Sequence, residues 1–386
     1  MPYTDVIKNC LYKIFAFNFN FCARFMPAKK DLVVLLSPHN ASFNDSLGEM
    51  EKEFTRRGGF KVYKISCAGV RNFDFTSRSF AEVFRFFIKD ARKLAGAEYV
   101  FLNDNFMPLA DLKFKKGTVI TQLWHAEGAF KKFGLRLELP ENIRKRVEQG
   151  NRRLTFVTCT SKQLVPIYSE AFGVPEEKIL PIGSPRIDSL LNGRDAGEIK
   201  EKFLEKYPSC RGKKIVLYAP TFRDDEISDS RLLYSFDFKK FDEVLGDEYA
   251  LVVRLHPQFH KAAALSGNSV DATGYPDVNG LLKISDLLIT DYSSMCMDFA
   301  LLNKPMLFYA FDLKEYASTR EFYFDYYSYV PGTVAETFDG LLEAIKNKNF
   351  GQEKTEKFIE LNFDVVSSQT AAAVADAVIR ERSNKK

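Results

Sequence analysis

The sequence lacks most of the short motifs by which common enzyme classes are recognised. It has neither a Walker A motif nor Gly-x-Gly-x-x-Gly, which argues against a P-loop or a dinucleotide fingerprint. Gly-x-Ser-x-Gly, the nucleophile elbow of many hydrolases, is also missing. Asp-x-Asp is absent, and the six cysteines form no Cys-x-x-Cys pair and no Cys/His cluster with zinc spacing. We therefore expect no required metal and no cofactor.

The chain also lacks a large charge of one sign. It has 55 Lys+Arg against 51 Asp+Glu, a net charge of +4, which is too small to indicate a nucleic-acid partner. With 46% hydrophobic and 27% charged residues it can bury a core and remain soluble, and its 386 residues favour two domains over one. The unpaired cysteines fit reduced thiols in a cytosolic protein.

No hydrophobic run is long enough to cross a membrane, and no secretory signal with a small-residue cleavage site is visible. Residues 6–27 are apolar but are interrupted by two lysines, an arginine and three asparagines. As a helix, this segment would place several apolar side chains on one face, namely Ile7, Leu11, Ile14, Phe15, Phe21, Cys22 and Phe25. Such a helix can lie in a membrane interface or dock on the domain core, and the alternation over 17–21 also permits a short strand.

After Pro27 the chain alternates between short apolar strands and helical stretches. Strands are predicted over residues 32–37, 61–66, 99–102, 118–123, 155–158, 179–182, 215–218, 250–254, 287–289 and 306–309. Helices are predicted over 47–57, 79–94, 162–172, 238–245, 278–284, 295–302 and 367–382. This alternation indicates two α/β halves with parallel sheets and right-handed crossovers.

The chain becomes charged and loses strand character around residues 192–211, which predicts a domain junction there. We expect three parts: residues 1–28, residues 29–194, and residues 195–386 with a last helix that can cross back. Two such halves make the cleft between them the natural ligand site.

Two of the four histidines follow predicted strands, one in each half. His125 comes after the strand TVITQL, directly behind Trp124, and His256 comes after ALVVRL. Loops at the carboxyl ends of parallel strands bind ligands in open α/β sheets, and histidine exchanges protons near neutral pH. Each histidine alone is equally well explained as a surface or capping residue, but two at equivalent strand ends favour a reacting centre.

Basic and hydroxyl side chains at the same strand ends suit a diphosphate. Arg254 points to the same side as His256, because residues two apart share a face of a strand. Pro220, Thr221 and Arg223 follow another strand, and Arg186 a third, although each arginine could equally make a salt bridge. The run Asp291, Tyr292, Ser293, Ser294 precedes a helix that carries Asp298, so its serines can cap the helix and face an anion.

One stretch after His125 is rich in cations: Lys131, Lys132, Arg136, Arg144, Lys145, Arg146, Arg152 and Arg153. A solvated helix face is the ordinary explanation for such a run. An anionic membrane surface or a lipid diphosphate would suit it equally well. Together with the N-terminal segment, it favours a peripheral membrane enzyme.

Several of these segments together resemble the CDP-glycerol glycerophosphotransferase family, the polymerases and primases of teichoic acid. The matching pieces are QLWHAEGAFKKFG, IGSPRID, VLYAPTFRDD, VVRLHP and ISDLLITDYSSMCMDFALLNKPMLFY, which follow one another within residues 122–316. One departure is visible. The family often has Gly-Thr-Pro after the first histidine, where this chain has Ala126-Glu127-Gly128.

The resemblance implies a GT-B fold of two Rossmann-like domains, an N-terminal acceptor domain and a C-terminal CDP-donor domain. It implies transfer of a polyol phosphate, glycerol phosphate first and ribitol phosphate second, from a CDP-linked donor to an acceptor hydroxyl, with release of CMP. It assigns His125 as the catalytic base and His256 as the second essential histidine. The implied donor residues are Trp124, Arg186, Pro220, Thr221, Arg223, Arg254, Asp291, Ser293, Ser294 and Asp298.

The implied partners are a lipid-linked (undecaprenyl diphosphate) or polymeric acceptor and an anionic surface at the cytoplasmic face of the membrane. We expect Lys131, Lys132, Arg144, Lys145 and Arg146 to meet the membrane or the acceptor. One alternative is a GT-B glycosyltransferase with a nucleotide-sugar donor. Another is a lipid-binding scaffold without catalysis, which rests only on the N-terminal segment and the basic stretch.

Overall fold

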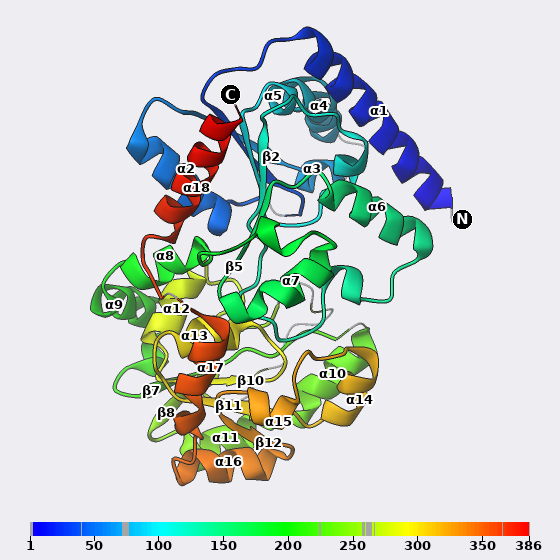
Figure 1. Cartoon of the computed structure of the whole chain (residues 1–386). Coiled ribbons are helices and arrows are strands. Elements are labelled where there is room, and N and C mark those ends of the chain that lie inside the picture. Colours follow the sequence, from blue (N-terminus) through cyan, green and yellow to red (C-terminus); the bar gives the residue numbers. More distant parts are fainter. Residues whose placement is uncertain are drawn as a thin grey trace. The chain divides into compact units, whose positions relative to one another are not determined.

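The computed structural model of the chain (Figure 1) describes residues 3–39, 41–71, 77–223, 225–256, 259, 265, 267–364 and 366–385. Asp224 and Pro257, which belong to two of the motifs above, lie outside these residues. The chain forms two compact units. Unit 1 comprises Met1–Glu127, Phe133–Leu191 and Phe363–Lys386, and unit 2 comprises Gly128–Lys132 and Asn192–Asn362.

Unit 1 is built on a six-stranded sheet with the order β2-β1-β3-β4-β5-β6. Its strands are β1 (Leu32–Ser37), β2 (Lys61–Ser66), β3 (Tyr99–Leu102), β4 (Val119–Gln122), β5 (Phe156–Cys159) and β6 (Ile179–Pro181). Every neighbouring pair is parallel, which confirms the predicted sheet type. The continuous apolar run of β1 is fully buried, as expected for a strand covered on both faces.

Helices cover this sheet on both faces. They are α1 (Tyr3–Phe25), α2 (Ser46–Arg57), α3 (Ala68–Arg71), α4 (Ser77–Arg85), α5 (Ala91–Ala95), α6 (Glu141–Asn151), α7 (Val165–Phe172), α8 (Arg186–Asn192) and α18 (Thr370–Asn384). On one face, alternate residues of β1 and β3 pack against α2 and α18. The helix predicted over 79–94 is interrupted by a π-helical turn, η1 (Phe86–Asp90), between α4 and α5.

The N-terminal segment is a helix, so the short strand over 17–21 is wrong. The helix α1 docks on α5, η1 and the 3₁₀ turn η2 (Met107–Asp111), with Phe15 and Phe19 fully buried. The single apolar face expected from the sequence is divided between two sides of the helix. Cys22 lies on the buried side with Phe15, whereas the other side is exposed and carries Leu11, Ile14, Phe17, Phe21 and Phe25.

The helix α18 belongs to unit 1, although it lies at the end of the chain. Asp188 caps it, because its two carboxylate oxygens accept the backbone N–H groups of Thr370 and Ala371 at 2.8 Å each. Arg57 of α2 holds the same helix through Asp376, at 2.6 Å. Within the residues that the structure describes, no helix has both the length and the apolar character needed to cross a membrane.

Unit 2 has its own six-stranded parallel sheet, with the order β12-β11-β10-β7-β8-β9. The strands are β7 (Lys214–Tyr218), β8 (Tyr249–Val253), β9 (Val270–Asp271), β10 (Leu287–Thr290), β11 (Met306–Tyr309) and β12 (Thr333–Ala335). The order is that of a Rossmann fold, with β7 and β10 as the two central strands.

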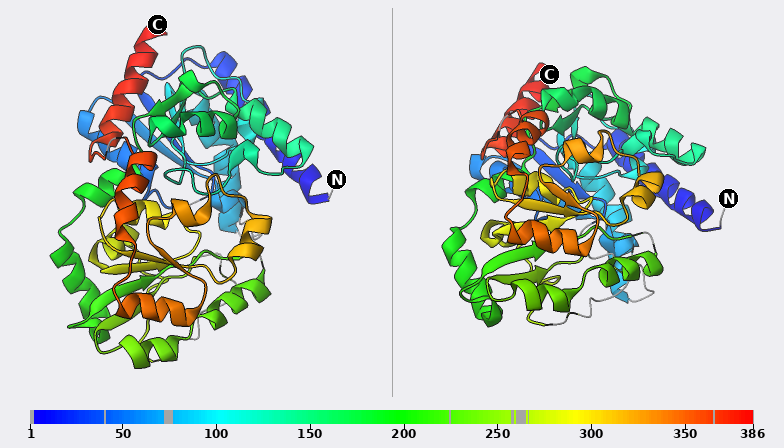
Figure 2. Two further views of the ribbon diagram at one scale, coloured as in Figure 1. Left: turned by 60° about the horizontal axis from the view of Figure 1, so that its bottom comes forward. Right: turned by 90° about the horizontal axis from the view of Figure 1, so that it is seen from below.

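The helices of unit 2 are α9 (Ala196–Lys206), α10 (Glu226–Ser235), α11 (Phe238–Leu245), α12 (Val278–Ile284), α13 (Met295–Ala300), α14 (Leu313–Thr319), α15 (Tyr326–Tyr329), α16 (Phe338–Lys346) and α17 (Thr355–Asn362). The helices α11 and α16 lie side by side on one face of the sheet (Figure 2). Alternate residues of β7, β8, β10 and β11 form the core beneath them. The sequence predicted neither β9 nor β12, the two short edge strands.

Candidate active site

In unit 1 the chain changes direction across the sheet between β1 and β3, which makes the ends of these strands a topological switch point. Ligands of open α/β sheets bind at such points, outside the carboxyl ends of the strands. His39 follows β1 by two residues, and Asp104 follows β3 by two residues. The neighbouring strand β4 leads into His125. Three ionisable side chains are thus brought to one edge of the sheet.

Asp104 lies between the two imidazoles. Its Oδ2 atom is 3.4 Å from Nδ1 of His125 and 3.3 Å from Nε2 of His39. The loop that holds Asp104 is itself fixed, because its backbone carbonyl accepts Nε2 of Gln122 at 3.1 Å. A carboxylate at Nδ1 sets the tautomer and orientation of an imidazole and leaves Nε2 available to accept a proton.

Trp124 holds the turn that presents His125. Its backbone has φ of 60°, a left-handed conformation that is uncommon for a bulky residue and that recurs at functional sites. The strain is supported locally, since the Trp124 N–H donates to Oε1 of Gln122 at 3.0 Å. The buried indole packs on Phe133 and Phe172, and its ring lies 4.1 Å from the ring of His125. Trp124 therefore positions the imidazole in this structure.

Arg186 lies beside the same loop in unit 1. Its Nη1 donates to the backbone carbonyl of His125 at 3.1 Å, and its Nε is 3.3 Å from Oε1 of Glu127. Glu127 is buried and also accepts the Ser184 hydroxyl at 2.9 Å. Glu127 stands where the family often has threonine, and here its carboxylate ties the guanidinium to the loop. The predicted donor residue Arg186 is thus close to His125 and already paired.

In unit 2 the switch point lies between β7 and β10. The loop after β7 carries Pro220, Thr221 and Arg223, and the residue after β10 is Asp291. Asp291 joins the two loops, because its Oδ1 accepts the backbone N–H of Thr221 at 2.8 Å. Four of the predicted donor residues are therefore brought together at this switch point.

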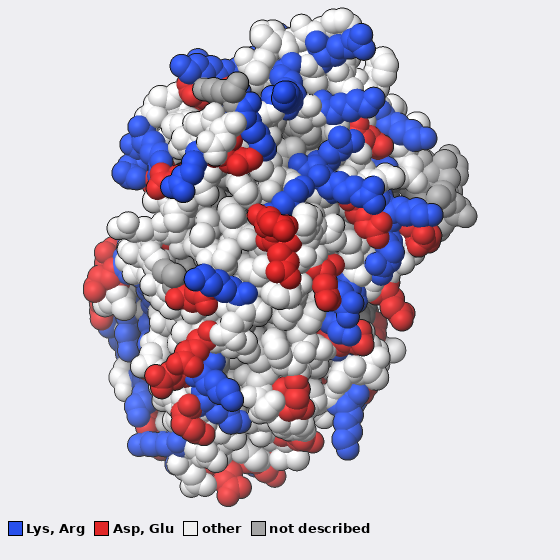
Figure 3. All heavy atoms as spheres, viewed as in Figure 1, with Lys and Arg blue, Asp and Glu red and all other residues white. Residues whose placement is uncertain are grey.

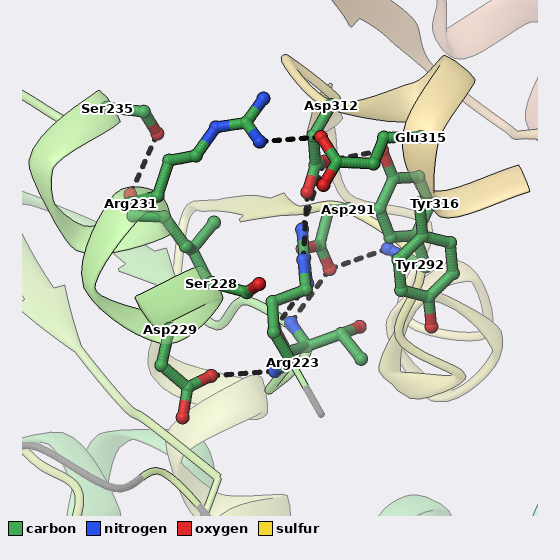
Figure 4. A network of polar contacts seen from close by, with 12 residues as sticks. Arg223, Ser228, Asp229, Arg231, Ser235, Asp291, Tyr292, Asp312, Glu315 and Tyr316 are labelled. Carbon is green, nitrogen blue, oxygen red and sulfur yellow. Dashed lines mark hydrogen bonds and ion pairs between the residues drawn. The ribbon is translucent and has the colours of Figure 1, made fainter. Parts of the chain in front are cut away.

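Arg223 is the centre of a buried charge network (Figure 4). Its Nη2 lies 3.0 Å from Asp291, its Nε lies 2.9 Å from Asp312, and its backbone N–H donates to Asp229 at 2.7 Å. Burial opposes the charge of the guanidinium, but the two carboxylates outweigh it and raise the pKa of Arg223. The guanidinium also packs over the rings of Tyr292 and Tyr316. These contacts fix the loop and neutralise the charge.

Arg254 and His256 follow β8 at the adjacent strand end. Nη1 of Arg254 donates to the carbonyls of Ala272 and Tyr275 at 2.9 and 2.7 Å, and burial lowers the pKa of the guanidinium. No carboxylate of the described residues lies within 4.0 Å of this guanidinium. The His256 ring stacks on Phe222 at 4.8 Å. Desolvation by nearby protein atoms, followed by the charges of Lys131 and Arg254, lowers the pKa of His256.

The serine pair lies at the start of α13, which spans six residues. The Ser293 hydroxyl accepts the backbone N–H of Met295 at 3.2 Å, whereas Ser294, at the N-cap position, makes no side-chain cap. Asp298 is buried within the same helix. Thr221 Oγ1 is also buried and has no hydrogen-bond partner among the described residues. A buried hydroxyl without a partner carries a free-energy cost that a bound ligand or water would remove.

The predicted basic stretch is dispersed. Lys131 and Lys132 belong to unit 2, whereas Arg144, Lys145 and Arg146 lie on α6 of unit 1. Figure 3 shows Lys and Arg side chains gathered over the α6 side of unit 1. Arg146 is paired with Asp111 at 2.5 Å and packs over Tyr12, and Lys145 is 3.1 Å from Glu141.

Asp104, His39 and Asp312 were not predicted from the sequence. A signal for the first two was present, because each lies within a few residues of a predicted strand end. Within the part of the chain that the structure describes, no group of three or more His, Cys, Asp or Glu side chains is placed to hold a metal ion.

Comparison with known proteins gives a consistent result. The family model of CDP-glycerol:poly(glycerophosphate) glycerophosphotransferase matches residues 18–380. The teichoic acid poly(ribitol-phosphate) polymerase of Bacillus spizizenii is 31% identical over 92% of this chain, but the chain spans only 57% of that protein. The teichoic acid glycerol-phosphate primase of Bacillus subtilis is 31% identical over 90% of this chain and 91% of its own length.

Among solved structures, the wall teichoic acid polymerase TagF superposes with a TM-score of 0.79 at 23% identity, covering 98% of this chain and 97% of that chain. The UDP-GlcNAc 2-epimerase of Neisseria meningitidis has a TM-score of 0.58 at 11% identity, a likeness that shows the fold alone. The family match covers both units. The chain belongs to the CDP-glycerol:poly(glycerophosphate) glycerophosphotransferase family.

Proposed function

We propose that this chain transfers a polyol phosphate from a CDP-linked donor to an acceptor hydroxyl of a teichoic acid or capsule-type polymer, and releases CMP. Glycerol phosphate is the first candidate for the transferred group and ribitol phosphate the second. The observation that carries the proposal is His125, held by Asp104 at the switch point of unit 1. Arg254, after β8 of unit 2, suits the donor diphosphate, and the family membership supports both assignments.

In the proposed reaction the acceptor hydroxyl attacks the phosphorus that bears the polyol. A new P–O bond forms while the bond to the CMP phosphate breaks, and the electron pair leaves with CMP. His125 takes the hydroxyl proton at Nε2, and Asp104 keeps Nδ1 protonated and the ring in place. In this scheme His125 is the catalytic residue, and Asp104 and Trp124 are positioning residues.

The donor phosphates are assigned to the side chains after β8. Arg254 would face the negative charge that shifts towards CMP. His256, with its lowered pKa, would act as a neutral hydrogen-bond donor in the free protein rather than as a standing cation. Arg223 and Asp291 would hold the loop after β7 rather than touch the donor, because their charges already neutralise each other.

The direct test is a donor panel with the purified chain and a lipid-linked acceptor. CDP-glycerol, CDP-ribitol and two UDP-sugars are compared for release of CMP or UDP. We expect CMP from one or both CDP-polyols and no UDP. Acceptor-dependent UDP release, with no CMP from either CDP-polyol, would instead establish the nucleotide-sugar transferase. If neither CMP nor UDP is released from any donor, the result would favour the alternative of a lipid-binding scaffold without catalysis.

We also propose that unit 1 docks on an anionic membrane at its cytoplasmic face, where the acceptor is held by an undecaprenyl diphosphate lipid. The outer side of α1 supports this, since Phe17 and Phe25 are 76% and 66% exposed. Phe84 of α4 is 70% exposed as well. Exposed aromatic side chains beside lysines and arginines are typical of helices that lie in a membrane interface.

Vesicle co-sedimentation tests this surface. Replacing Phe17, Phe21 and Phe25 by serine should abolish binding to vesicles that contain anionic lipid. The control is Ile227→Ser on α10 of unit 2, where the apolar side chain is even more exposed than the three phenylalanines. Equal binding by the triple variant and the wild type would contradict the proposed membrane surface.

A further inference from the structure

The segment Gly128–Lys132 comes directly after the His125 loop but belongs to unit 2. Glycine is required at position 128, where the chain passes into unit 2. Its φ is 66°, and a Cβ atom there would lie too close to unit 2, at 2.7 Å from Met297 Sδ and 2.6 Å from Asn362 Oδ1. Lys131 then forms an antiparallel bridge with Phe322. The neighbouring Phe130 ring packs against Phe322, Tyr326 and Tyr329. The backbone of Lys131 is therefore fixed on unit 2.

The side chains of Lys131 and Lys132 have different surroundings. Lys132 makes an ion pair with Glu321, with Nζ 2.9 Å from Oε2. Lys131 donates to the hydroxyl of Tyr316 at 3.3 Å and lies over the same ring at 5.8 Å. No carboxylate among the described residues approaches Nζ of Lys131 within 4.0 Å. Among the residues that the structure describes, Lys131 is therefore a cation without an ion-pair partner.

The electrostatic surroundings of Lys131 are those of the unit 2 site. Burial lowers its pKa to about 8, Asp291 partly offsets this, and Arg320 and Arg223 lower it further. Its own charge in turn lowers the pKa of His256. Arg223 is neutralised by Asp291 and Asp312, whereas Lys131 and Arg254 have no carboxylate partner among the described residues. Desolvated cations that lie close together repel each other, and a polyanion at the site would relieve that repulsion.

We infer that Lys131 contacts the diphosphate of the donor and is a donor-site residue rather than part of the membrane or acceptor surface. The inference rests on the proposed function, because it assigns the anion as the CDP-linked donor. It also replaces the role expected from sequence, where Lys131 and Lys132 formed one basic surface. In this arrangement the short link from His125 to Lys131 joins the loop of the catalytic base covalently to a residue that holds the donor.

The test compares Lys131→Met with Lys132→Met in the full chain, by calorimetric titration with CDP-glycerol, CMP and cytidine. Loss of one charge-assisted contact to phosphate weakens binding by about tenfold to a hundredfold. We expect that loss for CDP-glycerol in Lys131→Met, a smaller loss for CMP and none for cytidine. Lys132→Met should match the wild type with all three ligands. Unfolding curves and a Lys131→Arg variant, which should retain most of the affinity, exclude a folding defect.

Equal CDP-glycerol binding by Lys131→Met and the wild type would overturn the inference. An equal loss for cytidine would also overturn it, because cytidine carries no phosphate. A wild-type chain that binds no CDP-polyol would refute the proposed function instead, and inorganic pyrophosphate then becomes the probe. Weaker pyrophosphate binding by Lys131→Met would still support an anion contact, and unchanged binding would overturn it.

Discussion

The switch points of the two sheets carry opposite arrangements of charge. In unit 1, the carboxylate of Asp104 contacts two half-exposed imidazoles, those of His39 and His125. In unit 2, two carboxylates neutralise one buried guanidinium, Arg223, and the cations Lys131 and Arg254 have no carboxylate partner among the described residues. The first arrangement suits proton transfer, and the second suits an anion held by a rigid loop. Two sheets of the same type thus carry different parts of one proposed reaction.

The comparison predicts that Arg223 contributes to stability far more than to donor binding. Arg223→Met leaves Asp291 and Asp312 buried without their partner, which costs about 3–5 kcal/mol of unfolding free energy. Arg231→Met is the matched control, because its pair with Glu315 is 55% and 58% exposed and contributes about 0–1 kcal/mol. Chemical denaturation measures both. An Arg223→Met chain of native stability with weakened donor binding would show that Arg223 touches the donor after all.

The unit 1 arrangement predicts a loss of turnover when Asp104 becomes asparagine. The amide keeps the shape of the side chain but no longer fixes the His125 tautomer, so we expect kcat to fall about tenfold to a hundredfold or more. The donor dissociation constant should not change, because Asp104 lies in unit 1. Steady-state CMP release and equilibrium binding separate the two effects. His39→Gln serves as the companion variant, with a smaller loss, since its imidazole shares the carboxylate from the other side.

A rise in the donor dissociation constant of Asp104→Asn with kcat unchanged would contradict the assignment of proton transfer to unit 1 and donor binding to unit 2. Asp104 would then belong to donor binding rather than to the orientation of His125.

A smaller effect concerns pH. Lys131, with a pKa of about 8, is charged below that value and neutral above it, so donor affinity should fall as pH rises from 7 towards 9. It is faced by Asp291 after β10, Arg223 after β7, Arg320 after α14, Cys296 in α13 and His256 after β8. Burial raises the pKa of Cys296, and that of His256 is lowered, so both titrate outside this window. The decline should be absent in Lys131→Met, and a decline that persists there would contradict the assignment.

Much of the fold could be predicted because strands that are buried on both faces are continuous apolar runs. LVVLLS and the other central strands lie within a residue or two of their predicted bounds, and the edge strand KVYKIS matches its predicted bounds as well. The edge strands β9 and β12 were not predicted, because runs of two or three residues carry no periodic hydrophobic signal. The two sides of α1 were merged into one face, since Phe15 and Phe21 are both apolar and only the packing on α5 separates them.

The site was predicted less completely, because it depends on which strands are neighbours. His125 and His256 could be found by their position after strong strands, and the same rule applied to His39. Asp104 could not be linked to them, because nothing along the chain indicates that β3 lies between β1 and β4. A salt bridge was one expectation for Arg223, but its partners could not be predicted, because Asp291 and Asp312 lie 68 and 89 residues away in sequence.

The most direct test of the proposal that unit 1 supplies the base and unit 2 binds the donor is His125→Ala, assayed for both CMP release and donor binding. We expect turnover to fall about a hundredfold or more while the donor dissociation constant stays within about twofold of the wild type. Near-native turnover with unchanged donor affinity would contradict the account, because unit 1 would then not supply the base.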